Sequence, residues 1–586
     1  MYPGDSQLIK RQCLTETRSG PKLVSSSFMR RFVFLLPLLM TPTPAHTQDR
    51  SQARSMVISD RGIVATSQTL ASQAGAQVLA RGGSAIDAAI AANLVLGVVE
   101  PESCGIGGDL FAIYWDAKTG KLTAINASGW APTGLTIDYL KAKGITKMPQ
   151  EGIQSVTVPG AVDGWSKLHQ RFGRLPWKDL FAPAEYYAQH GYPVTEIISE
   201  AWKTEQKKLA ADANARTILL HDGATPKLGE VFRNPQLASA LRLIADQGAP
   251  AFYRGAIAKA LLKTSDRLGG TMKAADLAEF ESEWVTPLST DYHSWKVYEL
   301  PPSGQGIAAI EMLNILSLFP LASWPSRGIE ELHTQMEAQK LAYADLHRYV
   351  ADMRFAKVPV AGMVSMDYAR EQAKRIDRAK ARCDVEPGNP AVHGDTIYLS
   401  VVDREGNIVS LIQSLYQHFG SGVVVDEYGF PLQNRGGLFE LDPAHPDALA
   451  PRKRPFHTII PAFMEKGSVH IGFGIMGGLN QAQAHAQFVS NIVDHGMNIQ
   501  MALEAPRFTK KTWGGCDFLI ENRIPKEIRD GLAARGHQIK VQGDFSNEMG
   551  GGQAVIHDSA TGVNWGASDP RKDGAAVPEP HPYFAK

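Results

Sequence analysis

The change in sequence character at residue 396 constrains the fold of this chain more than any other feature. Thr396–Asp403 is a mostly apolar and β-branched run, and Glu405–Asn407 is a turn that leads into a second apolar run, Ile408–Ile412. This pattern predicts a β-hairpin whose first residue is Thr396. The preceding segment Glu386–Pro390 is rich in proline and glycine, which predicts an exposed loop that is easily cut. We therefore expect a hairpin that begins shortly after a cleavable loop.

Helical and strand-like patterns alternate along the rest of the chain. Ala85–Leu96 is Ala-rich and predicts a helix capped by Ser84, and Leu175–Ala356 is mostly helical in pattern. Further helices are expected at Leu70–Leu79, Leu237–Ala245, Leu332–Tyr349 and Gln481–Val493, and further strands at Gly62–Thr66, Leu110–Trp115, Thr458–Met464, Ser468–Gly472 and Gly552–Ile556. The spacing is too irregular for a doubly wound sheet, so the pattern favours a layered α/β sandwich.

The composition is that of a large globular protein without net charge. Of the 586 residues, 60 are Lys or Arg, 60 are Asp or Glu, and 44% are hydrophobic. Balanced charge gives no general field that attracts nucleic acid or anionic lipid, so we expect a small-molecule partner and no nucleic acid. The 17 histidines form no HExxH motif and the four cysteines form no CxxC pair. Neither a metal nor another cofactor is therefore expected.

The first 47 residues have the pattern of a leader followed by a secretory signal peptide. Arg30 and Arg31 precede the apolar run Phe32–Met40, and Thr41–Thr47 suits a processing region. The apolar run is too short to span a bilayer, and a single membrane anchor is the alternative. We expect a secreted or periplasmic protein with no stable membrane insertion after the signal is removed.

The cysteines are few and widely spaced. Loss of the leader would remove Cys13 and leave Cys104, Cys383 and Cys516 in the mature chain. An odd, sparse set of this kind does not indicate a disulfide framework.

A glycine-rich segment, Cys104–Asp109, could be mistaken for a nucleotide-binding loop. In a dinucleotide-binding fingerprint the glycines follow a strand and open a helix. Here they precede the apolar strand predicted at Leu110–Trp115, so we interpret the segment as a tight passage of the backbone.

A series of short motifs runs in order from about Gly62 to Asp573. The motifs are Gly82–Ala89, Val158–Gly160, Pro301–Gly304, His393–Thr396, Phe419–Gly422, Lys453–Pro455, Gly477–Gly478 and Gly566–Arg571. Taken together, they resemble the gamma-glutamyltransferase (glutathione hydrolase) family. The resemblance implies a four-layer αββα sandwich of the N-terminal-nucleophile hydrolase type, made as one precursor. It also implies self-cleavage between Asp395 and Thr396 into a large subunit, 48–395, and a small subunit, 396–586, that stay together.

The resemblance gives Thr396 the position of the nucleophile. A threonine hydroxyl needs a base, and a free α-amine on the same residue can act as one. By position, Gly477 and Gly478 would supply backbone N–H groups to the oxyanion, and Ser414 would hydrogen-bond the nucleophile and assist self-cleavage. Without the surrounding motifs, Thr396 would be interpreted as an ordinary strand threonine and Ser414 as a solvent-facing serine.

The expected substrate-binding positions depart from the usual family pattern. The family uses an arginine for the α-carboxylate of a gamma-glutamyl group and an acid for its α-amine. Ser128 stands where that arginine is expected, and Leu438 stands where the acid is expected. The other expected substrate-binding residues are Tyr416, Arg435, His457 and Thr458. This version is similar to the acylase-like branch related to cephalosporin (glutaryl-amide) acylases.

These departures leave more than one function open. The main expectation is hydrolysis or transfer of gamma-glutamyl amides such as glutathione through an acyl-enzyme. The first alternative is an acylase for glutaryl amides, in which Arg435 pairs with a distal carboxylate. Arg435 could equally form a surface or inter-subunit salt bridge. The second alternative is an unprocessed binding protein that has lost catalysis.

Overall fold

The fold is described from a computed structural model, in which residues 52–384 and 395–583 are placed well enough to describe. The predicted leader and signal, residues 1–47, and the predicted cleavable loop, Glu386–Pro390, lie outside the described residues. Within the described ranges, no helix is both long enough and apolar enough to cross a membrane.

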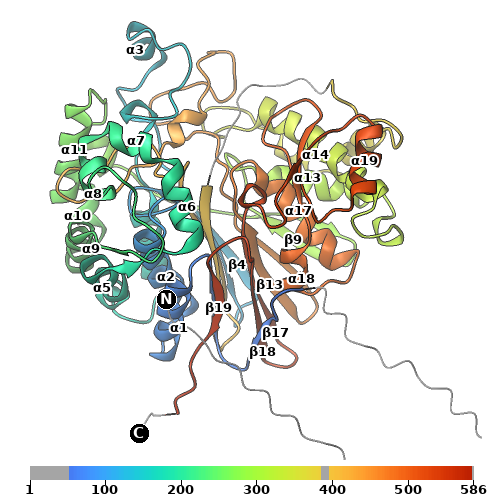
Figure 1. The fold of residues 1–586 in the computed structure, drawn as a ribbon, viewed down its shortest axis with the longest axis horizontal. Coiled ribbons are helices and arrows are strands. Elements are labelled where there is room, and N and C mark those ends of the chain that lie inside the picture. The colour runs from blue at the N-terminus through green and yellow to red at the C-terminus, as the bar shows by residue number, and fades with distance from the viewer. Residues whose placement is uncertain (1–51, 385–394, 584–586) are drawn as a thin grey trace, which may run out of the picture. The chain divides into compact units, whose positions relative to one another are not determined.

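Two seven-stranded sheets form the centre of the fold (Figure 1). Sheet I contains, in spatial order, β19 (Ala575–Pro578), β2 (Ile63–Thr66), β10 (Asp395–Val402), β11 (Ile408–Tyr416), β3 (Asp109–Asp116), β4 (Lys121–Ala127) and β7 (Glu283–Val285). Sheet II contains β1 (Val57–Ser59), β18 (Val563–Ser568), β17 (Gly552–Asp558), β13 (Val469–Ile475), β12 (Ala462–Lys466), β9 (Trp295–Glu299) and β8 (Leu288–Tyr292). All neighbouring strands within these two sheets are antiparallel.

The two sheets pack face to face over an apolar core. Phe111, Tyr398 and Ile412 point into this core from sheet I, and Phe463 and Val555 point into it from sheet II. All five side chains are buried. The strands are rich in apolar residues because the inner face of each sheet is buried against the other sheet.

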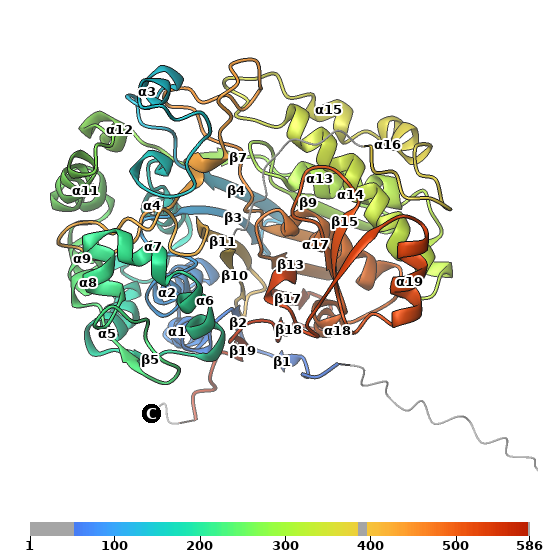
Figure 2. The same ribbon diagram turned by 45° about the horizontal axis from the view of Figure 1, so that its top comes forward.

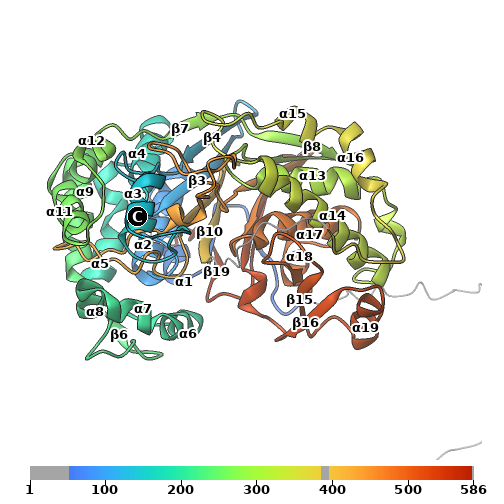
Figure 3. The same ribbon diagram turned by 90° about the horizontal axis from the view of Figure 1, so that it is seen from above.

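Helices cover the outer face of each sheet (Figure 3). The core outside sheet I receives residues from α1 (Thr69–Ala80), α2 (Ala85–Val99), α4 (Ala161–Phe172), α5 (Ala182–His190), α6 (Glu196–Thr204), α7 (Gln206–Ala211), α8 (Ala213–Leu219), α9 (Pro235–Gln247), α10 (Ala249–Tyr253), α11 (Ala256–Arg267) and α12 (Ala274–Ala278). The core outside sheet II receives residues from α13 (Gly306–Leu316), α14 (Ile329–Tyr349), α15 (Val360–Met363), α16 (Met366–Ala373), α17 (Asn480–Val493) and α18 (Ile499–Glu504). The predicted four-layer αββα sandwich is therefore confirmed.

Smaller elements lie at the edges of these layers. They are α3 (Ile137–Ala142), α19 (Lys526–Ala534), the pair β5 (Tyr192–Pro193) and β6 (Val231–Phe232), and a three-stranded sheet of β14 (Phe508–Thr509), β15 (Asp517–Glu521) and β16 (Gln538–Gln542). In the three-stranded sheet, β15 and β16 are parallel.

Local sequence explains the helix α2, which packs against sheet I. Ser84 Oγ accepts a hydrogen bond from the Asp87 backbone N–H, and the Asp87 carboxylate accepts one from the Ser84 N–H. This reciprocal pair is a capping box, which fixes where the helix begins. Nearly every residue of α2 is buried, which is expected of a helix that is apolar all round.

The predicted hairpin is confirmed and lies in the middle of sheet I. Strands β10 and β11 pair with each other and are flanked by β2 and β3. Strand β10 begins at Asp395, one residue before the predicted start. Both hairpin strands also contact β13 of sheet II, and Figure 2 shows the three strands at the meeting of the two halves.

One predicted strand boundary is wrong. The strand expected at Thr458–Met464 is β12 and begins only at Ala462, because upstream N–H groups already have side-chain partners: Ile459 N–H donates to His457 Nδ1, and Ile460 N–H donates to Gln481 Oε1. The region 175–356 is mostly helical, as predicted, but it also contains the short strands β5, β6, β7, β8 and β9. Pairing of β9 with β12, which is distant in sequence, supplies a partner that local pattern cannot reveal.

The cysteines also differ from expectation, because Cys383 and Cys516 form a disulfide. Their Cα atoms are 5.0 Å apart, within the normal range for a disulfide, and they are separated by 133 residues in sequence. Spacing alone could not indicate this pair.

Candidate active site

The hydroxyl groups of Thr396 and Ser414 lie together at one end of the central hairpin. Thr396 Oγ1 and Ser414 Oγ are 3.0 Å apart, and Ser414 Oγ accepts a hydrogen bond of 2.7 Å from the Tyr416 N–H. Both hydroxyl side chains are 0% exposed, so the alternative of a solvent-facing serine is wrong. The strand register shifts between Asp395 and Ile397, which places Thr396 at an irregularity of the ladder where a side chain can be re-aimed.

Gly477 and Gly478 form the turn between β13 and α17. Their φ angles are +125° and +61°, which glycine adopts far more easily than other residues. Among the described residues, no hydrogen bond uses the N–H group of either glycine. The turn immediately precedes a helix, whose N-terminal dipole favours negative charge. This geometry is able to stabilise an oxyanion.

Gln305 connects this turn to the predicted substrate-binding residues. Its Nε2 donates to the Gly478 carbonyl at 2.8 Å and also to the Thr458 carbonyl. Its backbone N–H donates to the His457 carbonyl at 3.1 Å. Gln305 follows the Pro301–Gly304 motif, but sequence reasoning did not assign it a role. Gln305 therefore holds the glycine turn and the His457–Thr458 segment next to each other.

A buried aspartate that sequence reasoning missed lies beside the hydroxyl pair. Asp109 is the register partner of Ser414 on the neighbouring strand β3. Its Oδ1 accepts from the Gly129 N–H at 3.0 Å, and its Oδ2 lies 3.0 Å from His457 Nε2. Because His457 Nδ1 accepts from a backbone N–H, Nε2 carries the proton and donates to Asp109. The sequence signal that could have identified Asp109 is its position as an acid between a run of glycines and an apolar strand.

The glycines before Asp109 confirm the predicted tight passage. A Cβ atom on Gly107 would lie 2.1 Å from the Pro431 carbonyl oxygen, and one on Gly108 would lie 2.4 Å from the Ser414 carbonyl oxygen. No larger residue fits against these backbone atoms, so the glycines allow the start of β3 to approach β11 and the Pro431 segment closely.

Arg435 is buried in the same cluster, which rules out a surface salt bridge. Its side chain is 0% exposed, its Nη1 donates to Thr458 Oγ1 at 2.7 Å, and its Cζ lies 4.5 Å from the centre of the Tyr416 ring. Its Nε lies 3.6 Å from Asp109 Oδ2, which is too far for a hydrogen bond but within the range of an ion pair. Because Asp109 and Arg435 belong to the two different proposed fragments, this ion pair agrees with the alternative of an inter-subunit salt bridge. In the described structure Arg435 Nε and Nη2 and the Tyr416 hydroxyl are buried without a hydrogen-bond partner. Buried donors of this kind cost free energy of folding unless a ligand accepts their hydrogen bonds.

Burial controls the charges of this cluster. Desolvation raises the pKa of Asp109 to about 7, against the lowering effect of the Arg435 cation. Desolvation lowers the pKa of Arg435 to about 10, so the guanidinium stays charged at neutral pH. Burial, together with Arg435 and Arg454, holds the pKa of His457 well below its usual range. The cluster therefore combines a fixed cation, a neutral imidazole and an acid that titrates near neutrality.

The two departures from the usual family pattern lie in different surroundings. Ser128 is buried, and its carbonyl accepts from Arg454 Nε at 2.8 Å. Leu438 lines a small cavity of about 20 Å³ together with Leu346, His347, Val350, Glu440, His445, Asp447, Phe456 and Trp513. Burial raises the pKa of both acids in this lining, Glu440 and Asp447. Neither Ser128 nor Leu438 carries a charge of its own, and burial disfavours the ionised form of the two acids next to Leu438.

Comparison with known proteins finds relatives over most of the chain. A family model described as gamma-glutamyltranspeptidase matches residues 71–579. The chain is 36% identical to a glutathione hydrolase-like YwrD proenzyme from Bacillus subtilis, with 89% of this chain and 99% of that protein covered. It is 35% identical to an oxamate amidohydrolase proenzyme from Klebsiella pneumoniae, with the same coverage of 89% and 99%.

A solved structure is also closely similar. The cephalosporin acylase from Bacillus halodurans superposes with a TM-score of 0.85 at 41% identity, covering 93% of this chain and all of that one.

Proposed function

Because the chain belongs to the gamma-glutamyltranspeptidase family of N-terminal-nucleophile hydrolases, we propose that it is an amidohydrolase whose nucleophile is Thr396. The observation that carries this proposal is the buried contact of 3.0 Å between Thr396 Oγ1 and Ser414 Oγ at the start of the central hairpin. Retention of this pair together with the Gly477–Gly478 turn argues against an unprocessed binding protein, because the fold alone does not require that combination.

Cleavage between Asp395 and Thr396 would create the base as well as the nucleophile. An α-amino group titrates at about 7.7 to 8.0, so a useful fraction is unprotonated near neutral pH. The amine would take the hydroxyl proton as Oγ1 attacks the amide carbonyl, and Ser414 would hydrogen-bond the nucleophile. The N–H groups of Gly477 and Gly478 would stabilise the oxyanion. The acyl-enzyme would then pass to water or to an amine.

The sheet topology supports stable association of the proposed fragments, 48–395 and 396–586. In sheet I, β10 and β11 of the small fragment lie between β2 and β3 of the large fragment. In sheet II, β12 of the small fragment pairs with β9 of the large fragment, and β18 pairs with β1. Separation would break ladders inside both sheets and expose their shared cores, which is costly.

An exported location is part of the proposal, with residues 1–47 as leader and signal. Disulfides persist mainly in oxidising compartments, and the Cys383–Cys516 disulfide suits a secreted or periplasmic protein.

Two acyl groups remain candidates, and both carry a carboxylate. Gamma-glutamyl amides such as glutathione are favoured by the similarity to a glutathione hydrolase-like protein. Glutaryl and related dicarboxylic amides are favoured by two donor nitrogens of buried Arg435, Nε and Nη2, and by the Tyr416 hydroxyl, which all lack a hydrogen-bond partner among the described residues. A planar guanidinium fork matches a carboxylate, and neither Ser128 nor Leu438 supplies a charge that could pair with an α-amine.

Comparison of glutaryl and gamma-glutamyl anilides tests the acyl preference. The α-amine of the gamma-glutamyl compound would lose its hydration without gaining an ionic partner, so we expect kcat/KM to favour the glutaryl anilide by roughly tenfold or more. Steady-state release of the aniline measures both values. A strong preference for the gamma-glutamyl anilide would contradict the interpretation of Ser128 and Leu438.

Binding of a carboxylate should strengthen as the pH falls through about 7, because Asp109 then takes up a proton. Ionised Asp109 competes for Arg435, whereas protonated Asp109 leaves the cation available. The competitive inhibition constant of glutarate, which stays ionised above pH 6, should therefore fall roughly three- to tenfold between pH 8 and pH 6. Asp109→Asn should flatten this dependence. An equal slope in that variant would show that another group is responsible.

A further inference from the structure

The segment that precedes the proposed cleavage point is held by its backbone against α14. His333 Nε2 lies 2.8 Å from the Asp377 carbonyl oxygen and donates to it. Lys340 Nζ donates to the Arg382 carbonyl at 2.5 Å. Both contacts use main-chain oxygens, so they depend on the path of the segment and not on its side chains. These residues all belong to the proposed large fragment.

The same segment is also fixed to residues of the proposed small fragment. The Ala381 N–H donates to the Arg535 carbonyl at 2.6 Å, and Cys383 forms the disulfide with Cys516. The Cys516 carbonyl in turn accepts a hydrogen bond of 2.7 Å from the Gln538 N–H, where β15 and β16 run in parallel. The disulfide partner is thus anchored in the three-stranded sheet of the small fragment.

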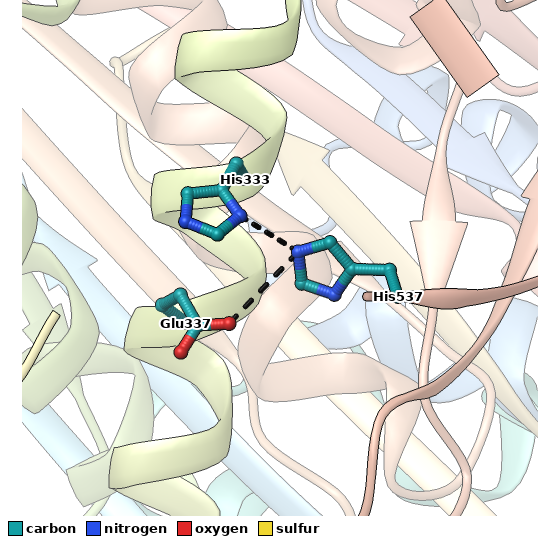
Figure 4. A group of neighbouring side chains, drawn as sticks. All are labelled: His333, Glu337 and His537. Atoms are coloured by element: carbon teal, nitrogen blue, oxygen red, sulfur yellow. Dashed lines mark hydrogen bonds and ion pairs between the residues drawn. The ribbon is translucent and has the colours of Figure 1, made fainter. Parts of the chain in front are cut away.

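A buried histidine pair makes a second connection between the same two parts (Figure 4). His333 of α14 and His537, just before β16, approach at 2.8 Å between Nδ1 and Nε2. Because His333 Nε2 already donates to Asp377, its Nδ1 accepts the proton of His537 Nε2. Burial lowers the pKa of both histidines, to about 3 for His537, so the pair is neutral and does not repel.

Glu337 lies beside this pair, and the three side chains resemble a set of metal ligands. However, Glu337 Oε1 forms an ion pair of 2.5 Å with Lys340 Nζ. A dication would have to displace that ammonium group and also separate two ring nitrogens that already satisfy each other. We interpret the cluster as a hydrogen-bonded joint between α14 and the small fragment.

We propose that the mature enzyme keeps its two fragments covalently joined through Cys383–Cys516, with the His333–His537 contact as the buried non-covalent part of the same joint. This inference rests on the proposed cleavage before Thr396. Before cleavage the disulfide closes a loop within one chain, with a sequence separation of 133. After cleavage the same bond is the covalent link between two polypeptides.

The link forms by ordinary thiol oxidation. The thiols of Cys383 and Cys516 lose two protons and two electrons to a thiol oxidant, such as a disulfide exchange protein of the export compartment or oxidised glutathione. Once joined, the fragments cannot diffuse apart, so reassembly after unfolding is intramolecular and independent of concentration.

Denaturing gels of alkylated protein, run with and without reductant, test the link. Wild type should give one band without reductant and two bands with reductant, separated at residue 396. Cys383→Ser and Cys516→Ser should each give two bands under both conditions. Cys104→Ala is the matched control, because Cys104 is buried outside the disulfide, and it should behave as wild type.

The wild-type gel separates failure of the link from failure of the proposed cleavage. Two bands without reductant would overturn the covalent link and leave the cleavage intact. One band in both lanes would overturn the cleavage, and with it the inference. A second measurement uses activity recovered after denaturation without reductant. Tenfold dilution should leave the half-time of recovery unchanged in wild type and lengthen it about tenfold in Cys383→Ser, because reassembly is then bimolecular. Equal concentration dependence in both would contradict the link.

Discussion

Replacing Thr396 with alanine should leave the chain as a single polypeptide and abolish amide hydrolysis. The variant loses the hydroxyl that attacks the peptide bond during maturation and the substrate amide during turnover. Without cleavage, no free α-amine forms at position 396, so nucleophile and base are lost together. We expect a reduced denaturing gel to show one band near the full mass of 63.7 kDa, less any leader, and kcat to fall by at least about 10³-fold.

Two control variants make this result specific. Thr396→Ser keeps a hydroxyl and an α-amine, so it should mature and retain measurable turnover. Ser410→Ala removes another buried hydroxyl of the same hairpin, one that contacts Tyr398 OH at 2.7 Å, and should mature normally. A Thr396→Ala protein that still splits before residue 396 and hydrolyses anilides would contradict the proposed chemistry.

Much of the fold follows from local sequence. The capping box at Ser84 and Asp87 begins α2 where the sequence predicts it, because the signal lies within four consecutive residues. The central hairpin was also predictable, because its apolar runs and turn are contiguous. Strand β12 was misplaced because its start depends on Gln481, which accepts the Ile460 N–H from a distant helix. Local pattern fixes the type of an element better than its boundary.

The site was predictable only in part, and for a similar reason. Family motifs identified Thr396, Ser414 and the glycine turn as positions, whereas the environment of Arg435 required the fold. Asp109 and His457 are separated by 348 residues, and their contact arises only when the segment before β12 packs against the start of β3. The same limit applies to the disulfide, because its two cysteines are separated by 133 residues and meet only in the folded chain. Sequence indicates which groups are present, and packing decides which of them meet.

Replacing Arg435 with methionine should weaken hydrolysis of carboxylate-bearing amides far more than that of neutral ones. Two donor nitrogens of Arg435, Nε and Nη2, are buried without a hydrogen-bond partner among the described residues, so a bound carboxylate would gain charge-assisted hydrogen bonds there. Each such interaction contributes about 1.5 to 3 kcal/mol. We expect kcat/KM for a glutaryl anilide to fall roughly 10- to 100-fold, while the uncharged valeryl anilide changes by less than about threefold.

Methionine is the appropriate replacement because it keeps apolar volume without leaving a buried anion. Asp109 already has a pKa of about 7, and loss of the neighbouring cation raises that pKa further, so Asp109 is protonated in the variant at neutral pH. Arg435→Lys keeps the charge but not the planar fork, and should give an intermediate loss on the glutaryl compound alone. A reduced gel with two bands shows that maturation is intact. An equal fall on both anilides would mean that Arg435 supports the fold of the site and does not bind the acyl carboxylate.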